Sequence, residues 1–269
     1  MKMHLGIRLF FCCIAPVLGQ FLVATSTSHA GIVVIGGTVT ETFTAQPPAT
    51  SWSTTAVGTP FGSGSGNITD NATADALIAN VNLGFVSSQL TLGGTAGTIA
   101  LQNESRYYTN GFIGTAPTGV DGNLALVTLT NGTGNNLASL AVRYDLGIQN
   151  GDVLTSEEIA GHRVYWSLTG NANSWNPIGN FGFQGAVGNP ATQTQTVNFN
   201  VPFSTWAAGT DAYILWLDDN AVTNPDGLYS LDNIAFTAVP EPSACLLAIG
   251  ALGVIGTKLR RKGRRQVTV

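Results

Sequence analysis

Apolar and polar residues alternate in short runs through most of the chain between residues 31 and 238. The clearest run alternates large apolar residues with small or charged ones, namely Leu140, Val142, Tyr144 and Leu146 against Ala141, Arg143 and Asp145. Shorter runs of the same kind cover 164–168, 197–201 and 213–217. Because successive side chains of a strand point to opposite faces, this period of two predicts half-buried antiparallel strands.

Turn-forming dipeptides separate these runs: Asp121-Gly122, Asn131-Gly132, Asn150-Gly151 and Asp226-Gly227. Only residues 73–81 and 155–160 have the pattern of short helices. Gly, Thr, Asn and Ser are abundant, which favours strands and turns over helices. The pattern predicts an all-β fold, an antiparallel β-sandwich of jelly-roll type that spans residues 31–238.

The first thirty residues have the composition of a secretory leader. Lys2 and Arg8 precede an apolar stretch over residues 9–23, and the segment ends in Ser28-His29-Ala30. Small residues at Ser28 and Ala30 suit signal peptidase, so we expect a signal helix over residues 1–30 and cleavage between Ala30 and Gly31. The alternative is an uncleaved N-terminal anchor.

The C-terminal end combines three features in a fixed order. Pro240-Glu241-Pro242 comes first, an apolar run over residues 244–257 follows, and a cluster of Lys and Arg fills residues 258–265. Prolines keep the first segment out of a helix, and therefore extended and accessible. As a helix the run would span about 21 Å, short of the ~30 Å hydrocarbon core, and the basic side chains can snorkel to make up the difference. We expect a short transmembrane helix whose basic tail stays in the cytoplasm.

This tripartite end resembles the PEP-CTERM sorting signal, which exosortases recognise, and residues 239–269 form the matching segment. The resemblance implies export, retention in the membrane through residues 244–257, and cleavage near Pro240-Glu241-Pro242 by a transpeptidase-like enzyme. The protein would then reach the cell surface or the extracellular matrix. The alternative is an ordinary single-span anchor with an incidental Pro-Glu-Pro triplet.

Charge and cysteine are distributed unevenly along the chain. Between residues 31 and 239 the cations are Arg106, Arg143 and Arg163, against fourteen acidic residues, which gives a formal charge of −11. Such a body repels phosphate backbones, so we do not expect it to bind nucleic acid. The three cysteines are residues 12, 13 and 245, so the body has neither disulfides nor a thiolate metal site.

Catalytic chemistry is difficult to build from these residues. The body has one histidine, His162, and no G-x-S-x-G motif, which leaves no basis for a Ser-His-Asp triad or for a zinc site. We expect His162 to be exposed or to cap a strand. Adjacent carboxylates at Glu157-Glu158 and Asp218-Asp219 diverge on a helix or a strand, so they do not converge on one bond. The sequence therefore favours a protein that is not an enzyme.

Two further resemblances concern the body. Segments 129–134, 140–144, 165–175, 214–220 and 227–234 resemble a sandwich module common in PEP-CTERM proteins. Glu41-Thr42-Phe43 with Trp52 is similar to the first strand of jelly-roll carbohydrate-binding modules. This second resemblance implies a structural Ca²⁺ held by Glu41, Asp232 and Asn233. Oxygen donors on an anionic exported protein suit this cation. The alternative is that Asp232 and Asn233 cap a turn while Glu41 is solvated.

Sugar binding would use aromatic rings flanked by amides. Trp175 lies between Asn173 and Asn176 in a predicted loop, and we expect its ring to be exposed. Trp216 faces away from Leu215 and Leu217, either onto an open sheet face or into a second core face. We therefore expect an exported, non-enzymatic surface or matrix protein whose partner is extracellular polysaccharide. The alternatives are a structural or adhesion protein without a specific small ligand and, less favoured, a secreted hydrolase.

Overall fold

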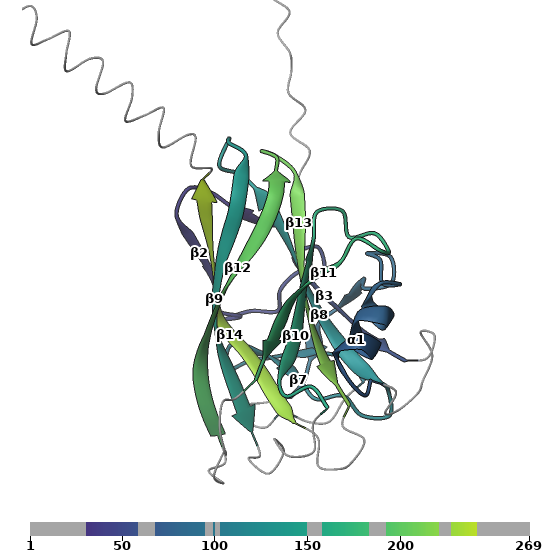
Figure 1. Cartoon of the computed structure of the whole chain (residues 1–269). Coiled ribbons are helices and arrows are strands. Elements are labelled where there is room, and N and C mark those ends of the chain that lie inside the picture. The colour runs from purple at the N-terminus through teal and green to yellow at the C-terminus, as the bar shows by residue number, and fades with distance from the viewer. Residues whose placement is uncertain are drawn as a thin grey trace, which may run out of the picture.

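Two β-sheets packed face to face form the body of the protein (Figure 1). The computed structural model describes residues 31–58, 68–94, 99, 103–149, 158–182, 192–220 and 227–240. The predicted signal and transmembrane helices, and residues 155–157 of the second possible helix, lie outside these ranges. Within them, no helix is both long and apolar enough to cross a bilayer. The prediction of an all-β sandwich is confirmed.

The first sheet has the strand order β11-β10-β13-β8-β3-β4, with β1 beside β8. Its strands are β1 (Ile32–Val34), β3 (Trp52–Val57), β4 (Ser88–Gln89), β8 (Gly122–Asn131), β10 (His162–Ser167), β11 (Asn176–Phe181) and β13 (Asp211–Asp219). The β1–β8 pair is parallel and the other pairs are antiparallel. Strand β8 is therefore central, with β13 on one side and β3 and β1 on the other.

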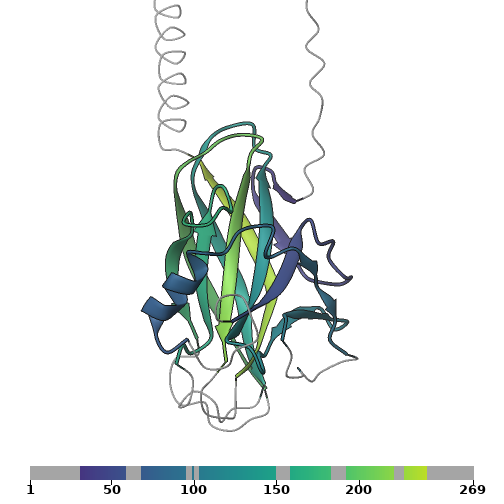
Figure 2. The same ribbon diagram turned by 90° about the vertical axis from the view of Figure 1, so that its right-hand side faces the viewer.

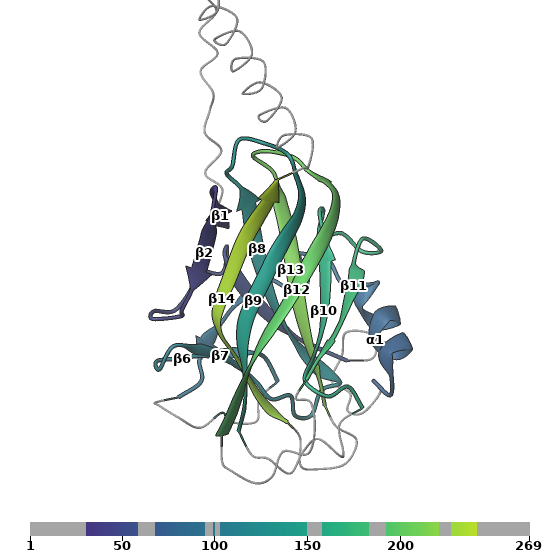
Figure 3. The same ribbon diagram turned by 60° about the vertical axis from the view of Figure 1, so that its left-hand side comes forward.

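The second sheet has the strand order β12-β9-β14-β7-β6-β5, with β2 beside β14. Its strands are β2 (Thr38–Glu41), β5 (Thr91–Leu92), β6 (Arg106–Tyr108), β7 (Phe112–Thr115), β9 (Leu137–Gln149), β12 (Thr192–Trp206) and β14 (Leu228–Pro240). Here β5 and β6 pair in parallel. The three longest strands, β9, β12 and β14, lie side by side and form one extended surface (Figure 3).

The main core fills the space between the sheets, as the alternation predicts. Leu140, Val142 and Tyr144 of β9 are buried, while Arg143 between them is exposed. Trp216 of β13 stacks on Trp52 of β3, with ring centroids 5.6 Å apart. Burial of such large side chains between sheets supplies most of the drive for folding.

A third layer covers the first sheet on the side away from the second (Figures 1 and 2). It contains helix α1 (Asn71–Ile78), which begins at a capping box in which the Asp70 side chain accepts a hydrogen bond from the Thr73 amide. Ile68, Ile78 and Val81 pack there against leucines of β8 and β13 and form a second core. The sequence predicted a helix near residues 73–81 but not this layer, which explains why β8 and β13 are buried on both faces.

Candidate functional site

The outer face of the second sheet, here called the polar face, presents amide, hydroxyl and charged side chains from adjacent strands. Its members are Arg143 and Asp145 of β9, Thr194, Thr196, Asn198 and Asn200 of β12, and Ser230, Asp232 and Thr237 of β14. Each belongs to the outward set because the apolar residues between them point into the core. The strands fix their spacing, so the face is a rigid array of hydrogen-bonding groups.

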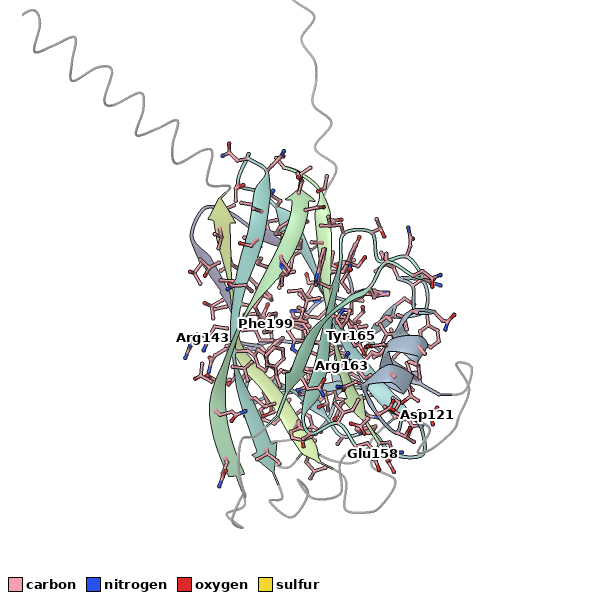
Figure 4. The ribbon with its side chains drawn as sticks, viewed as in Figure 1. Asp121, Arg143, Glu158, Arg163, Tyr165 and Phe199 are labelled. Atoms are coloured by element: carbon pink, nitrogen blue, oxygen red, sulfur yellow. The ribbon has the colours of Figure 1, made fainter. Side chains whose placement is uncertain are left out.

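One depression in the polar face lies between β9, β12 and β14. It has a volume of about 310 Å³ and is lined by Ala141, Val142, Arg143, Asn198, Phe199, Asn200 and Thr237. Asn198 and Asn200 are exposed and stand opposite Arg143 and Ala141 across the strand pair. Figure 4 shows Arg143 pointing outward from the sheet. The depression therefore offers two amides and a guanidinium around a shallow hollow.

A second depression, of about 350 Å³, surrounds two carboxylates. Asp145 and Asp232 are direct cross-strand partners and point to the same face. The Asp145 carboxylate accepts hydrogen bonds from Thr196 Oγ1 at 3.0 Å and from Asn233 Nδ2 at 3.0 Å. Arg143 lies 3.6 Å from it. Partial burial raises the pKa of Asp232 above its usual value and is the largest effect. The hydrogen bond from the Asn233 amide lowers this pKa, and the charge of Asp145 raises it further.

The predicted calcium ligands lie near this second depression but are not equally placed. Asp232 and Asn233 lie at a β-bulge of β14, where Asn233 adopts φ 49°. Glu41 is on the adjacent β2, opposite Ile234, and its Oε1 accepts from the Thr42 and Phe43 amides at 3.1 Å each. Among the described residues, no group of three or more His, Cys, Asp or Glu side chains could hold a metal ion. The calcium site stays a prediction.

The aromatic groups predicted to bind sugar are placed differently from the expectation. Trp175 is half-buried against the second core, and its indole Nε1 donates to Val81 O at 2.9 Å. The expectation of an exposed ring is therefore wrong, because the unforeseen third layer covers it. Asn173 and Asn176 are exposed. Trp216 takes the second of its two possible positions, fully buried between the sheets, and so presents no surface to a ligand.

His162 is also placed differently from the expectation of an exposed or capping residue. Its side chain is fully buried at the start of β10, where Nε2 lies 2.8 Å from Thr115 Oγ1 of the opposite sheet. The Tyr229 ring packs against it at a centroid distance of 5.6 Å. Burial lowers the pKa of His162 to about 3, so it is neutral at physiological pH. It therefore bridges the two sheets inside the protein.

Sequence reasoning did not find Asp145, Thr196, Asn198 or Asn200 as a group. The alternation places all of them on one face of their strands, but only the register of β12 against β9 brings them together. Of the residues predicted at the two cleavage points, Gly31 is half-buried and Pro240 is the last residue of β14. Ala30, Glu241 and Pro242 lie outside the described residues.

The C-terminal segment matches a family model described as the PEP-CTERM protein-sorting motif, over residues 238–265. The resemblance seen in the sequence is confirmed, and the motif indicates an exported, surface-sorted protein. No curated protein matches the chain.

Several solved β-sandwich domains are similar to the body. The K1 cleaved adhesin domain of Lys-gingipain from Porphyromonas gingivalis W83 is 18% identical, with a TM-score of 0.40, over 76% of this chain and 99% of that domain. A mannan-recognising carbohydrate-binding module is 17% identical, with a TM-score of 0.28, over 48% of this chain and 74% of that one. The C-terminal carbohydrate-binding module of a marine laminarinase from Zobellia galactanivorans is 15% identical, with a TM-score of 0.26, over 49% and 86%. These likenesses are too distant to carry a functional argument.

Proposed function

We propose that this chain is a surface or matrix protein sorted by an exosortase, and that its sandwich binds extracellular polysaccharide without catalysis. Signal peptidase would cleave between Ala30 and Gly31. The apolar run 244–257 would hold the exported chain in the membrane until exosortase cleaves near Pro240-Glu241-Pro242. The match to the sorting motif supports this route.

The single observation that carries the binding role is the polar face. Asn198 and Asn200 present exposed amides beside Arg143, on rigid strands and around a hollow of about 310 Å³. Sugars present closely spaced hydroxyls, which amides and guanidinium groups can hydrogen-bond as donors, and amides also as acceptors. An extended sheet face suits a long polymer because several residues along the strands can contact successive units.

The absence of catalysis is part of the proposal. The body's one histidine is His162, which is buried between the sheets and neutral, so it is out of reach of a substrate. The two carboxylates closest to an open hollow, Asp145 and Asp232, are cross-strand neighbours held by Thr196 and Asn233. The proposal assigns these two carboxylates to binding and gives them no acid–base role.

A specific observation also favours the second candidate, an adhesion or structural role without a small ligand. All five Trp side chains lie within the described residues and are buried or half-buried, and both hollows are shallow. A protein surface that binds polysaccharide commonly includes an aromatic ring on which a sugar can stack. A flat polar face without such a ring would suit weak contacts with another macromolecule.

A glycan-array screen of the body, residues 31–240, tests the first candidate, with and without Ca²⁺. We expect binding to one polysaccharide class, reduced at least several-fold by Asn198→Ala with Asn200→Ala. The matched control is Asn176→Ala, which removes an exposed amide from the other sheet. Loss with the control alone would move the site to the Trp175 loop, and no binding to any glycan would favour the adhesion role.

A further inference from the structure

The end of the sandwich at which β14 finishes carries a cluster of exposed apolar side chains. Four large apolar residues among those described are exposed, and three of them, Val33 (44%), Ile35 (59%) and Val239 (38%), belong to this end. Thr38 pairs with Thr237, so the β1–β2 turn lies beside the end of β14, where Ala238 N donates to Gly37 O. We call Val33, Ile35 and Val239 the apolar rim.

The surroundings of the apolar rim are poor in charge. The two turns beside it, residues 132–136 and 207–210, consist of Gly, Thr, Asn and Ala (Figure 3). The carboxylate of Asp211, at the start of β13, accepts a hydrogen bond from Thr130 Oγ1 at 2.6 Å. By contrast, Asp121 and Glu158 lie toward the opposite end of the body (Figure 4). An anionic body thus has one end that a membrane surface would not repel strongly.

The length of chain beyond β14 limits how far this end can be from the bilayer. The apolar run begins at Ala244, four residues after Pro240. Four fully extended residues reach about 14 Å at most. The headgroup layer on each side of the hydrocarbon core is about 5–7 Å thick. The run is also shorter than the core is thick, and a short span draws its flanking residues toward the bilayer. While the run is in the membrane, the end of β14 can therefore lie no more than about 14 Å from the hydrocarbon core, which brings it within reach of the headgroups but does not fix its orientation.

We propose that the apolar rim rests in the lipid headgroup layer while the C-terminal run is attached, so that the sandwich stands upright on the membrane. Partly inserted apolar side chains at an interface are stabilised by leaving water. The β12–β9–β14 strands then run away from the membrane, and the polar face is presented sideways to the surroundings. This inference rests on the membrane-anchoring step of the proposed function.

Fluorescence quenching in vesicles tests the proposal on the exported chain that begins at Gly31 and keeps the C-terminal run, with Cys245 replaced by Ser. One dye is placed at Gly36→Cys, where an added side chain meets nothing within 4 Å. A second is placed at Asn103→Cys, which is exposed and lies two residues from Ser105, a contact of Asn123 near the start of β8. The vesicles are phosphatidylcholine with a minor fraction of phosphatidylglycerol and a headgroup spin-labelled lipid, and co-flotation reports anchoring separately.

We expect the dye at residue 36 to be quenched several-fold more than the dye at residue 103. Val33→Ser, Ile35→Ser and Val239→Ser combined should remove most of that difference, whereas Leu92→Ser, which changes an exposed apolar residue elsewhere, should not. Equal quenching in a chain that floats with the vesicles would overturn the proposal and leave the anchor intact. A chain that does not float would overturn both. Equal quenching together with loss of exosortase cleavage in the triple variant would assign the apolar rim to the enzyme.

Discussion

The guanidinium of Arg163 makes a two-pronged ion pair with the carboxylate of Asp75. Nε lies 2.7 Å from Oδ1 and Nη2 lies 2.7 Å from Oδ2. Arg163 belongs to β10 and Asp75 to α1, so the pair fastens the third layer to the first sheet. Tyr165 donates its hydroxyl to the same carboxylate at 2.9 Å, and Asn180 accepts from Nη1 at 2.7 Å. One carboxylate thus serves two partners on the neighbouring strand.

Replacing Asp75 by Ala should destabilise the body by roughly 2–3 kcal/mol. The physical reason is that the Arg163 side chain, only 9% exposed, would lose its carboxylate partner and keep the Asn180 oxygen, and the Tyr165 hydroxyl would lose its acceptor. Asp75→Asn keeps one oxygen acceptor but loses the charge and the second oxygen, so it should lower the free energy of unfolding by less. Urea denaturation of the body measures both. Equal midpoints for wild type and Asp75→Ala would show that the ion pair contributes nothing to stability.

The stability of the protein should fall in acid partly because of His162. In the folded state burial holds the pKa of His162 at about 3, whereas an unfolded histidine has a pKa of about 6.5. Below pH 6.5 the unfolded chain takes up a proton that the folded chain does not. The stability that depends on a neutral His162 is therefore fully present above pH 6.5. It is lost as the pH falls toward 3, by up to ~1.4 kcal/mol per pH unit.

The variant His162→Gln isolates that contribution. Glutamine can still hydrogen-bond Thr115 but does not titrate, so the variant differs from the wild type in one titrating group. Denaturation midpoints at pH 7.5 and 4.5 should therefore differ less for the variant than for the wild type. Parallel pH profiles would mean that His162 is protonated in the folded protein.

The strands were predictable because their signal is local. Leu140, Val142 and Tyr144 alternate with polar residues, and this alternation alone fixes which side enters the core. For Trp216 the same local signal left two alternatives. The alternation shows that Trp216 points away from Leu215 and Leu217, but it does not show which face of the sheet another layer covers. The third layer is built by Ile68, Ile78 and Val81 from a segment without a strong pattern, so it was not foreseen.

The candidate site was less predictable because it depends on register. Asp145 and Asp232 are 87 positions apart, and only the pairing of β9 with β14 makes them neighbours. A shift of one residue would have sent either carboxylate to the other face. The bulge between Asp232 and Ala235 adds a further change that no local pattern specifies. The contacts of Glu41, the other predicted carboxylate ligand, do not depend on register in this way. Its carboxylate accepts hydrogen bonds from the Thr42 and Phe43 amides, which follow it directly in the chain.

If Asp232 is a ligand of a structural calcium ion, Ca²⁺ should raise the melting temperature of the body. Asp145 and Asp232 are like charges on directly opposed residues, which disfavours the fold in the absence of a cation. A hundredfold excess of Ca²⁺ over its dissociation constant would stabilise the folded state by ~2.7 kcal/mol, or roughly 5–10 °C in melting temperature. Asp232→Asn should remove this response and, in chelator, should melt no lower than the wild type.

Glu41→Gln provides the matched comparison for the predicted calcium site. If Glu41 is a ligand, the variant should lose most of the response to Ca²⁺. If its carboxylate only caps the Thr42 and Phe43 amides, the response should persist. A wild-type melting temperature that chelator does not change would mean that no structural calcium is bound.

Sorting should depend on the segment that directly follows the sandwich. Pro240 closes β14 opposite Leu137, and Glu241 and Pro242 come next, before the apolar run at 244–257. Replacing Pro240, Glu241 and Pro242 by Ala removes the two residues that cannot join a helix interior, together with the charge between them. The leader and the apolar run are unchanged, so export should continue. Cleavage should fail, because the enzyme would meet neither the extended backbone nor the carboxylate.

The expected product in an exosortase-bearing host is a longer chain that stays with the membrane fraction, whereas the wild type is shortened and reaches the surface. Mass spectrometry of both fractions measures this directly, and a mature N-terminus at Gly31 in both proteins would show that the leader is processed normally. Glu241→Gln is the graded control, since it keeps both prolines and removes only the charge. If the triple variant has the same mass and location as the wild type, the Pro-Glu-Pro triplet is incidental and the run is an ordinary anchor.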